Sequence, residues 1–237
     1  MIARLLVTLA AALALAGCAS TGPGPAPASP RQVERAGMTE AEAETAARRF
    51  VSVVRTVEPV AERECRARAP GLNCDYLIVV DDRPDQPANA FQSRDSSGRP
   101  VIAFTLALIA DIVNADELAF VMSHEAAHHI RNHLDRQRMN ATAGAQLLGG
   151  LASIAGAGMA GVELAAQIGA TVGARSYSKE FELEADALGA RIAQAAGYDA
   201  LRGALYFSRI ADPGDQFLGT HPPNADRLDT VRRALEG

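Results

Sequence analysis

The sequence predicts an α+β fold that is predominantly helical, with a small β-sheet beside one central helix. Three observations lead to this prediction: long stretches with helical periodicity that open on capping residues, one short cluster of β-rich segments between residues 76 and 104, and the lack of an internal repeat. The 237 residues are 48% hydrophobic and 22% charged, which supports one packed core and excludes a disordered chain. The formal net charge of −5 gives no electrostatic basis for nucleic-acid binding.

The first seventeen residues have the features of an export signal. A positive start at Arg4 precedes an apolar run, Leu5 to Leu15, and the sequence Leu-Ala-Gly-Cys then ends at Cys18. This pattern resembles the lipobox of bacterial lipoproteins. The resemblance implies acylation of Cys18 and, because Ala19 is not Asp, a lipid-anchored location on the periplasmic side of the outer membrane. The alternative is an ordinary secretory signal with an incidental cysteine.

Residues 18–37 are rich in proline and glycine, a composition that suits an extended tether and cannot bury a core. Residues 38–237 are predicted to form one domain. Two further cysteines remain, Cys65 and Cys74, and we expect a disulfide between them because an exported chain meets an oxidising compartment. The alternative is two free thiols packed as small apolar groups.

The first helix is predicted from Thr39 to about Ala69. Thr39 and Glu42 form a capping box, and apolar positions then recur among arginines and glutamates. A short β-rich run from Tyr76 to Val80 predicts a strand.

A hairpin and the central helix come next. Asn89–Gln92 and Val101–Phe104 flank a turn-rich stretch, which predicts a hairpin or an irregular strand pair, and therefore a small sheet. Asn114 and Glu117 form a second capping box. This box opens a helix that is expected to reach about Arg138.

Residues 141–174 consist mainly of Ala, Gly and Leu, with Glu163 as the single charge. The glycines weaken a helix, whereas the continuous apolarity favours burial, a lid or contact with lipid. Glu163 and the shortage of large apolar residues argue against a membrane-spanning helix.

The C-terminal third of the chain predicts further helices. Tyr177–Ala196 has helical spacing and is closed by Gly197. Asp199 caps a helix that reaches about Ile210, and a last helix is expected over Asn224–Leu235.

The central helix carries the pattern His-Glu-Ala-Ala-His at residues 124–128. Residues four apart lie one turn apart on nearly the same face of a helix, so His124 and His128 can bind one ion. Glu125 points aside, where it can take a proton from a water molecule at that ion. His129 and His133 share the same spacing without an intervening glutamate, and they are expected on other faces of this helix as polar surface or supporting groups.

A catalytic zinc site takes three protein ligands, and the candidates for the third lie on the helix that follows the Ala/Gly-rich stretch. Glu182 and Asp186 share a face of this helix, whereas Glu184 points roughly the opposite way. One carboxylate of the pair could bind the metal while the other accepts the N–H of a ligand histidine. Glu180 and Glu184 are explained by an acidic helix start.

These motifs resemble the gluzincin peptidases of the CAAX prenyl protease and HtpX heat-shock protease family. The resemblance spans about Met38 to Leu235 and implies a zincin-like fold with the small sheet next to the active-site helix. It further implies one zinc ion per chain, a general base and a metal-supporting carboxylate. Carried over to this chain, the zinc ligands are His124, His128 and Glu182, the base is Glu125, and the supporting carboxylate is Asp186.

The same resemblance assigns a substrate edge and a late histidine. Asn89, Ala90 and Phe91 match the family's Asn-Ala-Phe stretch, and with Gln92 they are expected to bind an extended polypeptide. Residues 92–98 are polar, where the family commonly has an apolar, glycine-containing strand. His221 is expected at the active site, either as a donor to the developing oxyanion or as an inhibitory fourth zinc ligand. For Arg227 a surface ion pair is the expectation, with neutralisation of charge near the site as the alternative.

The lipobox and the cysteine pair are typical of a periplasmic lipoprotein branch of this family. That branch implies a zinc endopeptidase acting on unfolded or misassembled cell-envelope proteins, with outer-membrane assembly machinery as a partner. Two alternatives stay open. One is a non-catalytic zinc lipoprotein that serves as a chaperone or assembly factor, and the other is a metal-independent membrane-surface protein built around residues 141–174.

Overall fold

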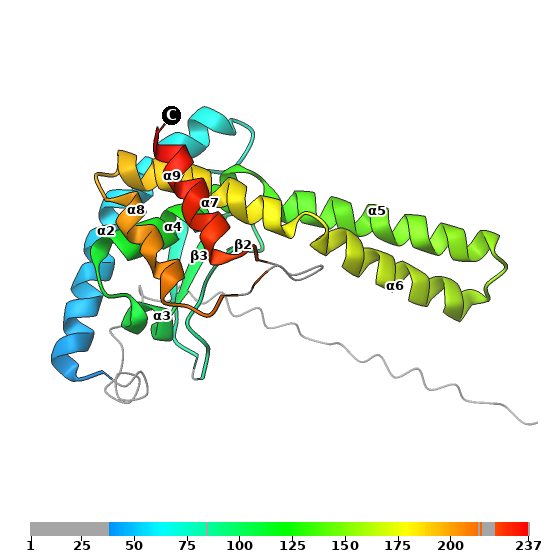
Figure 1. Ribbon diagram of the computed structural model, residues 1–237, viewed down its shortest axis with the longest axis horizontal. Coiled ribbons are helices and arrows are strands. Elements are labelled where there is room, and N and C mark those ends of the chain that lie inside the picture. The colour runs from blue at the N-terminus through cyan, green and yellow to red at the C-terminus, as the bar shows by residue number, and fades with distance from the viewer. Residues whose placement is uncertain (1–37, 84, 213, 215–220, 237) are drawn as a thin grey trace, which may run out of the picture.

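The computed structural model describes residues 38–83, 85–212, 214 and 221–236. The predicted export signal, Cys18 and the tether lie outside these residues. Within them the predicted fold class is confirmed: the chain is mainly helical, and its helices pack against a three-stranded sheet of order β1-β3-β2. Figure 1 shows a compact helical body from which one pair of helices projects.

Helix α2 (Glu40–Arg68) begins at the predicted capping box, in which the Thr39 hydroxyl accepts from the backbone of Glu42 and the Glu42 carboxylate accepts from the backbone of Thr39. Its buried face packs on the helix that carries the His-Glu-Ala-Ala-His pattern. This face ends at Cys65, which forms a disulfide with Cys74. The structure therefore contains the predicted disulfide.

The sheet consists of β1 (Leu77–Asp81), β2 (Ala90–Arg94) and β3 (Pro100–Thr105). β2 and β3 form the predicted antiparallel hairpin, and β1 pairs parallel to β3. β2 is an edge strand in the described sheet. A short helix, α3 (Leu106–Asp111), follows directly because the Thr105 hydroxyl caps it by accepting from the backbone of Leu108.

Helix α4 (Ala115–Ile130) lies at the centre of the body, and twelve of its sixteen residues are buried. The prediction of one helix continuing to Arg138 is wrong. The chain breaks at Asn132, which has φ of 55°, a left-handed conformation that asparagine adopts more readily than most residues. Arg94 donates to the Asn132 side chain at 2.8 Å and anchors the break to β2.

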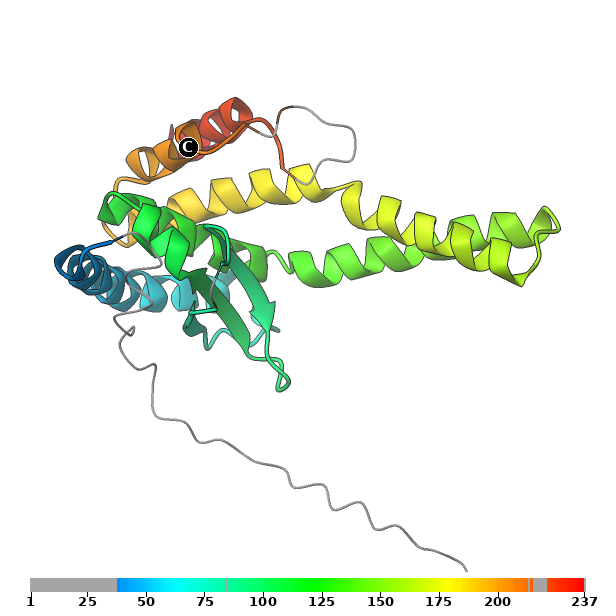
Figure 2. The same ribbon diagram turned by 90° about the horizontal axis from the view of Figure 1, so that it is seen from below.

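The Ala/Gly-rich stretch forms two antiparallel helices, α5 (His133–Ile154) and α6 (Met159–Arg175), which project from the body (Figures 1 and 2). No helix among the described residues combines the length and the apolarity that a membrane crossing needs.

The C-terminal part contains α7 (Ser178–Ala195), α8 (Ala200–Ala204), the 3₁₀ helix η1 (Leu205–Ser208) and α9 (Asn224–Glu236), close to the predicted bounds. α7 packs on α4, and α9 packs on α7. A Cβ atom added at Gly189 of α7 would lie 2.9 Å from the Cα of His124. The two helices that carry the predicted ligands therefore touch through their backbones.

Candidate functional site

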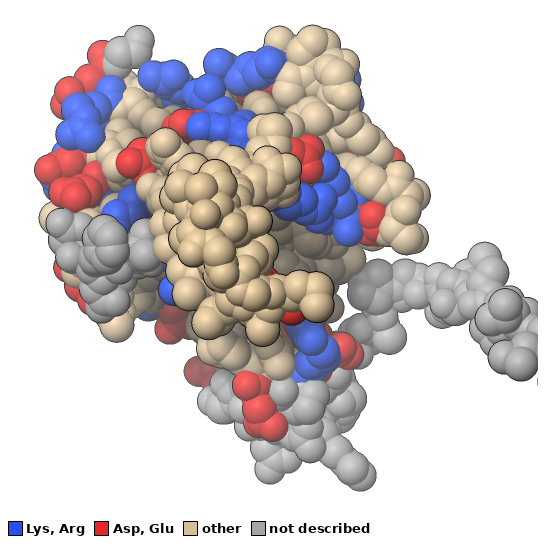
Figure 3. Space-filling view, turned by 90° about the vertical axis from the view of Figure 1, so that its right-hand side faces the viewer, with Lys and Arg blue, Asp and Glu red and all other residues tan. Residues whose placement is uncertain are grey.

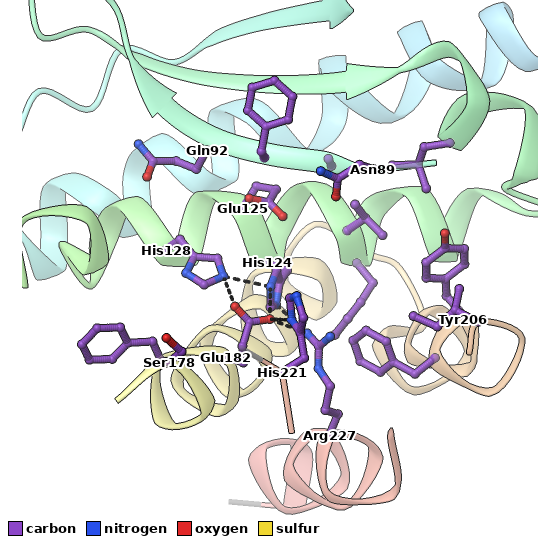
Figure 4. Close-up of a pocket in the computed structure, with 18 of the residues that line it drawn as sticks. Asn89, Gln92, His124, Glu125, His128, Ser178, Glu182, Tyr206, His221 and Arg227 are labelled. Carbon is purple, nitrogen blue, oxygen red and sulfur yellow. Dashed lines mark hydrogen bonds and ion pairs between the residues drawn. The ribbon is translucent and has the colours of Figure 1, made fainter. Parts of the chain in front are cut away.

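Two helices bring the three predicted ligands together. His124 and His128 lie one turn apart on α4, and Glu182 lies on the second turn of α7. The Nε2 atoms of the histidines are 3.0 Å apart, and oxygens of Glu182 lie 3.6 Å from Nε2 of His124 and 3.3 Å from Nε2 of His128. Figure 4 shows the three side chains converging.

The arrangement fits a zinc ion. Ligand atoms that lie about 2.0–2.1 Å from a tetrahedral zinc ion are separated by about 3.3 Å from one another, and the separations of 3.0–3.6 Å in this site bracket that value. Two imidazoles and one carboxylate are also the donors that catalytic zinc sites use when one position is left for water. Glu182, which is separated from the histidines by more than fifty residues, thus completes a possible metal site.

Asp186 fixes the orientation of His124. Its carboxylate accepts a hydrogen bond from Nδ1 of His124 at 2.9 Å and two bonds of 2.7 Å from the guanidinium of Arg227 on α9. Because Asp186 holds a proton on Nδ1 of His124, Nε2 is the nitrogen that faces the cluster and would bind a metal in place of its own proton. The expectation that Arg227 forms a surface ion pair is wrong, since this residue is buried and its guanidinium lies over the ring of Phe207.

A second chain of contacts fixes His128. Nε2 of His133 lies 3.2 Å from Glu184, and because a carboxylate only accepts, this nitrogen carries the proton. Burial and the neighbouring His128 lower the pKa of His133 to about 4, so its ring is neutral and its Nδ1 can accept. Nδ1 of His128 lies 2.8 Å away and donates to it, so Nε2 of His128 is the nitrogen that faces the cluster. Arg136 donates to Glu184 at 2.7 Å.

The electrostatics of the cluster favour a positive charge. Burial disfavours the imidazolium form of His124, but hydrogen bonds to Asp186 and Glu182 outweigh burial and raise its pKa to about 10. Burial also opposes the charged form of Glu182, whereas hydrogen bonds from His124, His128 and His221 hold the pKa of Glu182 well below its usual range. A divalent cation would meet the same preference.

The ligand cluster opens into a cavity of about 660 Å³. Glu125 lines this cavity, as do the predicted substrate-edge residues Asn89, Ala90, Phe91 and Gln92. Figure 4 shows β2 on one side of α4 and α7 on the other, so Glu125 lies between the ligands and the edge strand. His221, before α9, also lines the cavity, and its Nδ1 lies 3.1 Å from Glu182.

Helices α4 and α7 and the three-stranded sheet all lie within the part of the chain that matches a known protein family. Residues 47–235 match the model of Peptidase family M48. The chain belongs to peptidase family M48. This assignment supports a metallopeptidase and agrees at the family level with the resemblance drawn from the motifs.

Relatives of this M48 chain come from several bacteria. A Vibrio cholerae protein is 33% identical over 150 residues, covering 57% of this chain and 31% of its own length. Proteins named beta-barrel assembly-enhancing protease are 32% identical over 133 residues in Yersinia pestis and 29% identical over 134 residues in Escherichia coli strain K12. Each match covers 50% of this chain and 27% of the relative. The M48 chain therefore matches 27–31% of the length of these relatives.

Two expectations about the other histidines need correction. His133 does not lie on the same helix as His129, because the break at Asn132 places it on α5. His129 is buried rather than a surface group, and its Nε2 donates to the carbonyl of Asn73 at 2.7 Å. Glu184 is not simply part of an acidic helix start, since it is the partner of His133.

Sequence reasoning missed Arg136 and the buried position of Arg227. Each lies on a different helix from the motif residues. Between them stands a chain break or a loop whose conformation the sequence does not indicate, so helical spacing does not link either arginine to the site. The one available signal was the pair of carboxylates on α7, Glu184 and Asp186, each of which needs a charge partner where it is shielded from water.

Proposed function

We propose that this M48 chain is a zinc-dependent endopeptidase in which His124, His128 and Glu182 hold one zinc ion. The observation that carries the proposal is the convergence of two imidazole nitrogens and a carboxylate at 3.0–3.6 Å, from separate helices, beside a cavity. The zinc ion would act as a Lewis acid and lower the pKa of a water molecule toward about 7.

Glu125 is the proposed general base. It is one residue beyond His124, lines the cavity and is buried, with 9% of its surface exposed. In this position its carboxylate can take a proton from the attacking water and then deliver it to the leaving amine of a peptide. Asp186 and His133 hold Nδ1 of the two histidines, so that Nε2 of each faces the proposed zinc ion, which would take the place of any proton there.

His221 completes the proposed site. Its contact with Glu182 supports a place next to the reacting groups. Two roles fit this position: a donor to the oxyanion that develops on the substrate, or a fourth ligand that inhibits the resting enzyme. Removal of His221 lowers the turnover rate in the first case and raises it in the second.

The proposed substrates are unfolded or misassembled polypeptides of the cell envelope. An extended segment can add to the edge strand β2, and backbone hydrogen bonds of this kind tolerate many sequences. The relatives named beta-barrel assembly-enhancing protease support a role in quality control at the outer membrane. Acylation at Cys18, proposed from the lipobox, would keep residues 38–237 as a peptidase domain on the periplasmic face of that membrane.

Replacing Glu125 by Gln tests the proposed function. The variant keeps the side-chain shape but lacks the base, so we expect normal folding, normal zinc content and a loss of at least about 100-fold in cleavage of a labelled unfolded protein. Glu180→Gln makes the same chemical change at an exposed residue outside the cavity lining and serves as the matched control, which should cleave like the parent. Full cleavage by Glu125→Gln would exclude Glu125 as the base, whereas zinc binding without any cleavage by the parent would support the non-catalytic zinc protein.

A further inference from the structure

The α5–α6 hairpin has an inverted distribution of side chains. Its helices touch through glycines: a Cβ at Gly144 would lie 2.0 Å from the carbonyl oxygen of Gly169, and a Cβ at Gly173 would lie 2.1 Å from the carbonyl oxygen of Asn140. Between residues 139 and 175 the buried residues are glycines. The hydrophobic effect in water therefore contributes little to the contact between these two helices.

The large apolar side chains of the hairpin face outward instead. On α5 they recur at i, i+4 and i+7, and on α6 at i, i+4 and i+8. Because the two helices are antiparallel and touch at Gly144 and Gly169, this spacing places the apolar rows of α5 and α6 on the same side of the hairpin. We call this side the apolar face, and its members are 37–86% exposed: Leu147, Leu151, Ile154, Leu164, Ile168 and Val172.

The opposite side of the hairpin carries its polar residues. Glu163 and Gln167 of α6 lie there with Gln146 of α5, and Gln167 donates to Glu163 at 3.5 Å. Glu163 is the one charge between Arg138 and Arg175. Figure 3, which looks at the hairpin end, shows uncharged residues over the projecting helices and charged residues around the body. The α5–α6 hairpin is therefore amphipathic.

We propose that the hairpin lies in the surface of a phospholipid membrane, with the apolar face among the acyl chains of one leaflet. Small residues between helices and large apolar residues outside them are the arrangement found in lipid, where close backbone packing holds helices together. The proposal does not depend on the peptidase reaction.

The backbone and hydroxyl groups of the hairpin suit this environment. In the turn at its tip the N–H groups of Ala155, Gly156 and Ala157 donate to carbonyls of α5. The hydroxyls of Thr142 and Thr171 donate to carbonyls four residues earlier. Polar groups paired within the hairpin avoid the cost of unpaired groups near lipid.

Lipid fits the apolar face better than a protein partner does. Protein interfaces are enriched in aromatic residues and arginine, and residues 139–174 contain no aromatic residue and no arginine. The sequence also predicts lipid attachment at Cys18, and one anchor combined with a second membrane contact gives stable attachment.

Membrane contact would also orient the cavity. His133 and Gln137 at the base of α5 line it, as do Ser178 and Phe181 at the start of α7. A hairpin lying on the membrane therefore holds the cavity beside the lipid surface, where a polypeptide emerging from or failing to enter the bilayer is within reach.

The test is flotation of residues 19–237 with phosphatidylethanolamine–phosphatidylglycerol vesicles (3:1), so that neither the apolar run of the predicted export signal nor an acyl chain at Cys18 is present. We expect Leu151→Gln/Ile168→Gln to weaken vesicle binding at least ten-fold, because polar groups replace apolar ones on the apolar face without changing charge. Val51→Gln/Val113→Gln, which alters two exposed valines outside the hairpin, should bind like the parent.

A second measurement separates the faces. A dye attached at Ile168→Cys should be quenched by lipids brominated in their acyl chains, whereas a dye at Gln146→Cys should not. Equal binding by the parent and the hairpin variant, or equal quenching at both positions, would overturn the proposal. So would a dimer in light scattering that is lost in Leu151→Gln/Ile168→Gln while neither protein binds vesicles, since the face would then join two copies. Cleavage by the parent is measured separately and does not enter these outcomes.

Discussion

At the scale of single residues, the site depends on which nitrogen of each histidine carries a proton. Asp186 accepts from Nδ1 of His124, and His133 accepts from Nδ1 of His128. Each partner therefore directs Nε2 toward Glu182 and fixes the plane of the ring. The partner of His128 is unusual in being a neutral imidazole, itself oriented by Glu184.

Replacing His133 by Phe tests this arrangement. Phenylalanine can keep the stacking on the ring of Phe181, which lies 4.6 Å from the His133 ring, but it cannot accept from His128. We expect a folded protein whose zinc affinity, measured by competition with a chelator dye, falls about 10–100-fold.

His129→Gln is the matched control for that substitution. His129 faces away from the cluster toward Asn73, so its loss should lower stability without changing zinc affinity. If both variants bound zinc like the parent, His133 would have no part in orienting the ligand.

The sequence predicted the residues of the cluster and the supporting carboxylate Asp186, but it did not predict the arginines that pair with the carboxylates of α7. The spacing of His124 and His128 follows from one helical turn, so it can be read directly from the chain. Arg227 and Arg136 reach the site through the packing of α9 and α5, which depends on loop conformation and the break at Asn132. No periodic pattern in the sequence indicates contacts of that kind.

At the scale of elements, the position of Glu182 depends on how closely α7 approaches α4. Gly189 makes this approach possible, because a Cβ there would lie 2.9 Å from both N and Cα of His124. Backbone atoms cannot move aside as a flexible side chain can. The distance between the two ligand-bearing helices is therefore set by a residue that binds nothing itself.

Gly189→Ala should push α7 away from α4. We expect a loss of about 1–3 kcal/mol in the free energy of unfolding, as in other overpacked contacts, together with weaker zinc binding as Glu182 withdraws. Urea unfolding and chelator competition measure the two effects.

Gly150→Ala provides the comparison for this substitution. It lies in α5 with open space around its Cβ position, so alanine should leave zinc binding unchanged and stabilise the helix by up to about 1 kcal/mol. Unchanged stability and zinc affinity in Gly189→Ala would show that the helices are not set by this contact.

Capping boxes and turn residues predicted most elements, since these signals are local. The prediction failed where two residues, Arg131 and Asn132, separate α4 from α5. Asparagine at that point has no distinct pattern, and its left-handed conformation is stabilised by Arg94 from a distant strand. The hairpin of α5 and α6 was also left open, because glycines between the helices weaken the helical signal while permitting their close contact.

At the scale of the whole molecule, the disulfide braces the side of α4 that faces away from α7. Cys65 and Cys74 tie the end of α2 to the segment that leads into β1. From this segment Asn73 accepts from His129, and the Tyr76 hydroxyl donates to the carbonyl of Ala126. The crosslink therefore holds a segment that contacts the site helix directly.

Cys65→Ser/Cys74→Ser should lower the free energy of unfolding by about 2–3 kcal/mol, the size expected for opening a loop of about ten residues. Urea unfolding of the variant and the parent measures the change. Reduction of the parent should reproduce it, and reduction should not affect the variant. Equal stability of the two proteins would show that the segment holds its position without the crosslink.

The most direct test of the whole account is anomalous scattering at the zinc edge from crystals grown with one equivalent of zinc. We predict one peak per chain, at about 2.0–2.2 Å from Nε2 of His124, Nε2 of His128 and an oxygen of Glu182. A Glu182→Ala crystal should show that peak weakened or gone. No peak at these residues in the parent, or a peak from which the Glu182 carboxylate is turned away, would contradict the account.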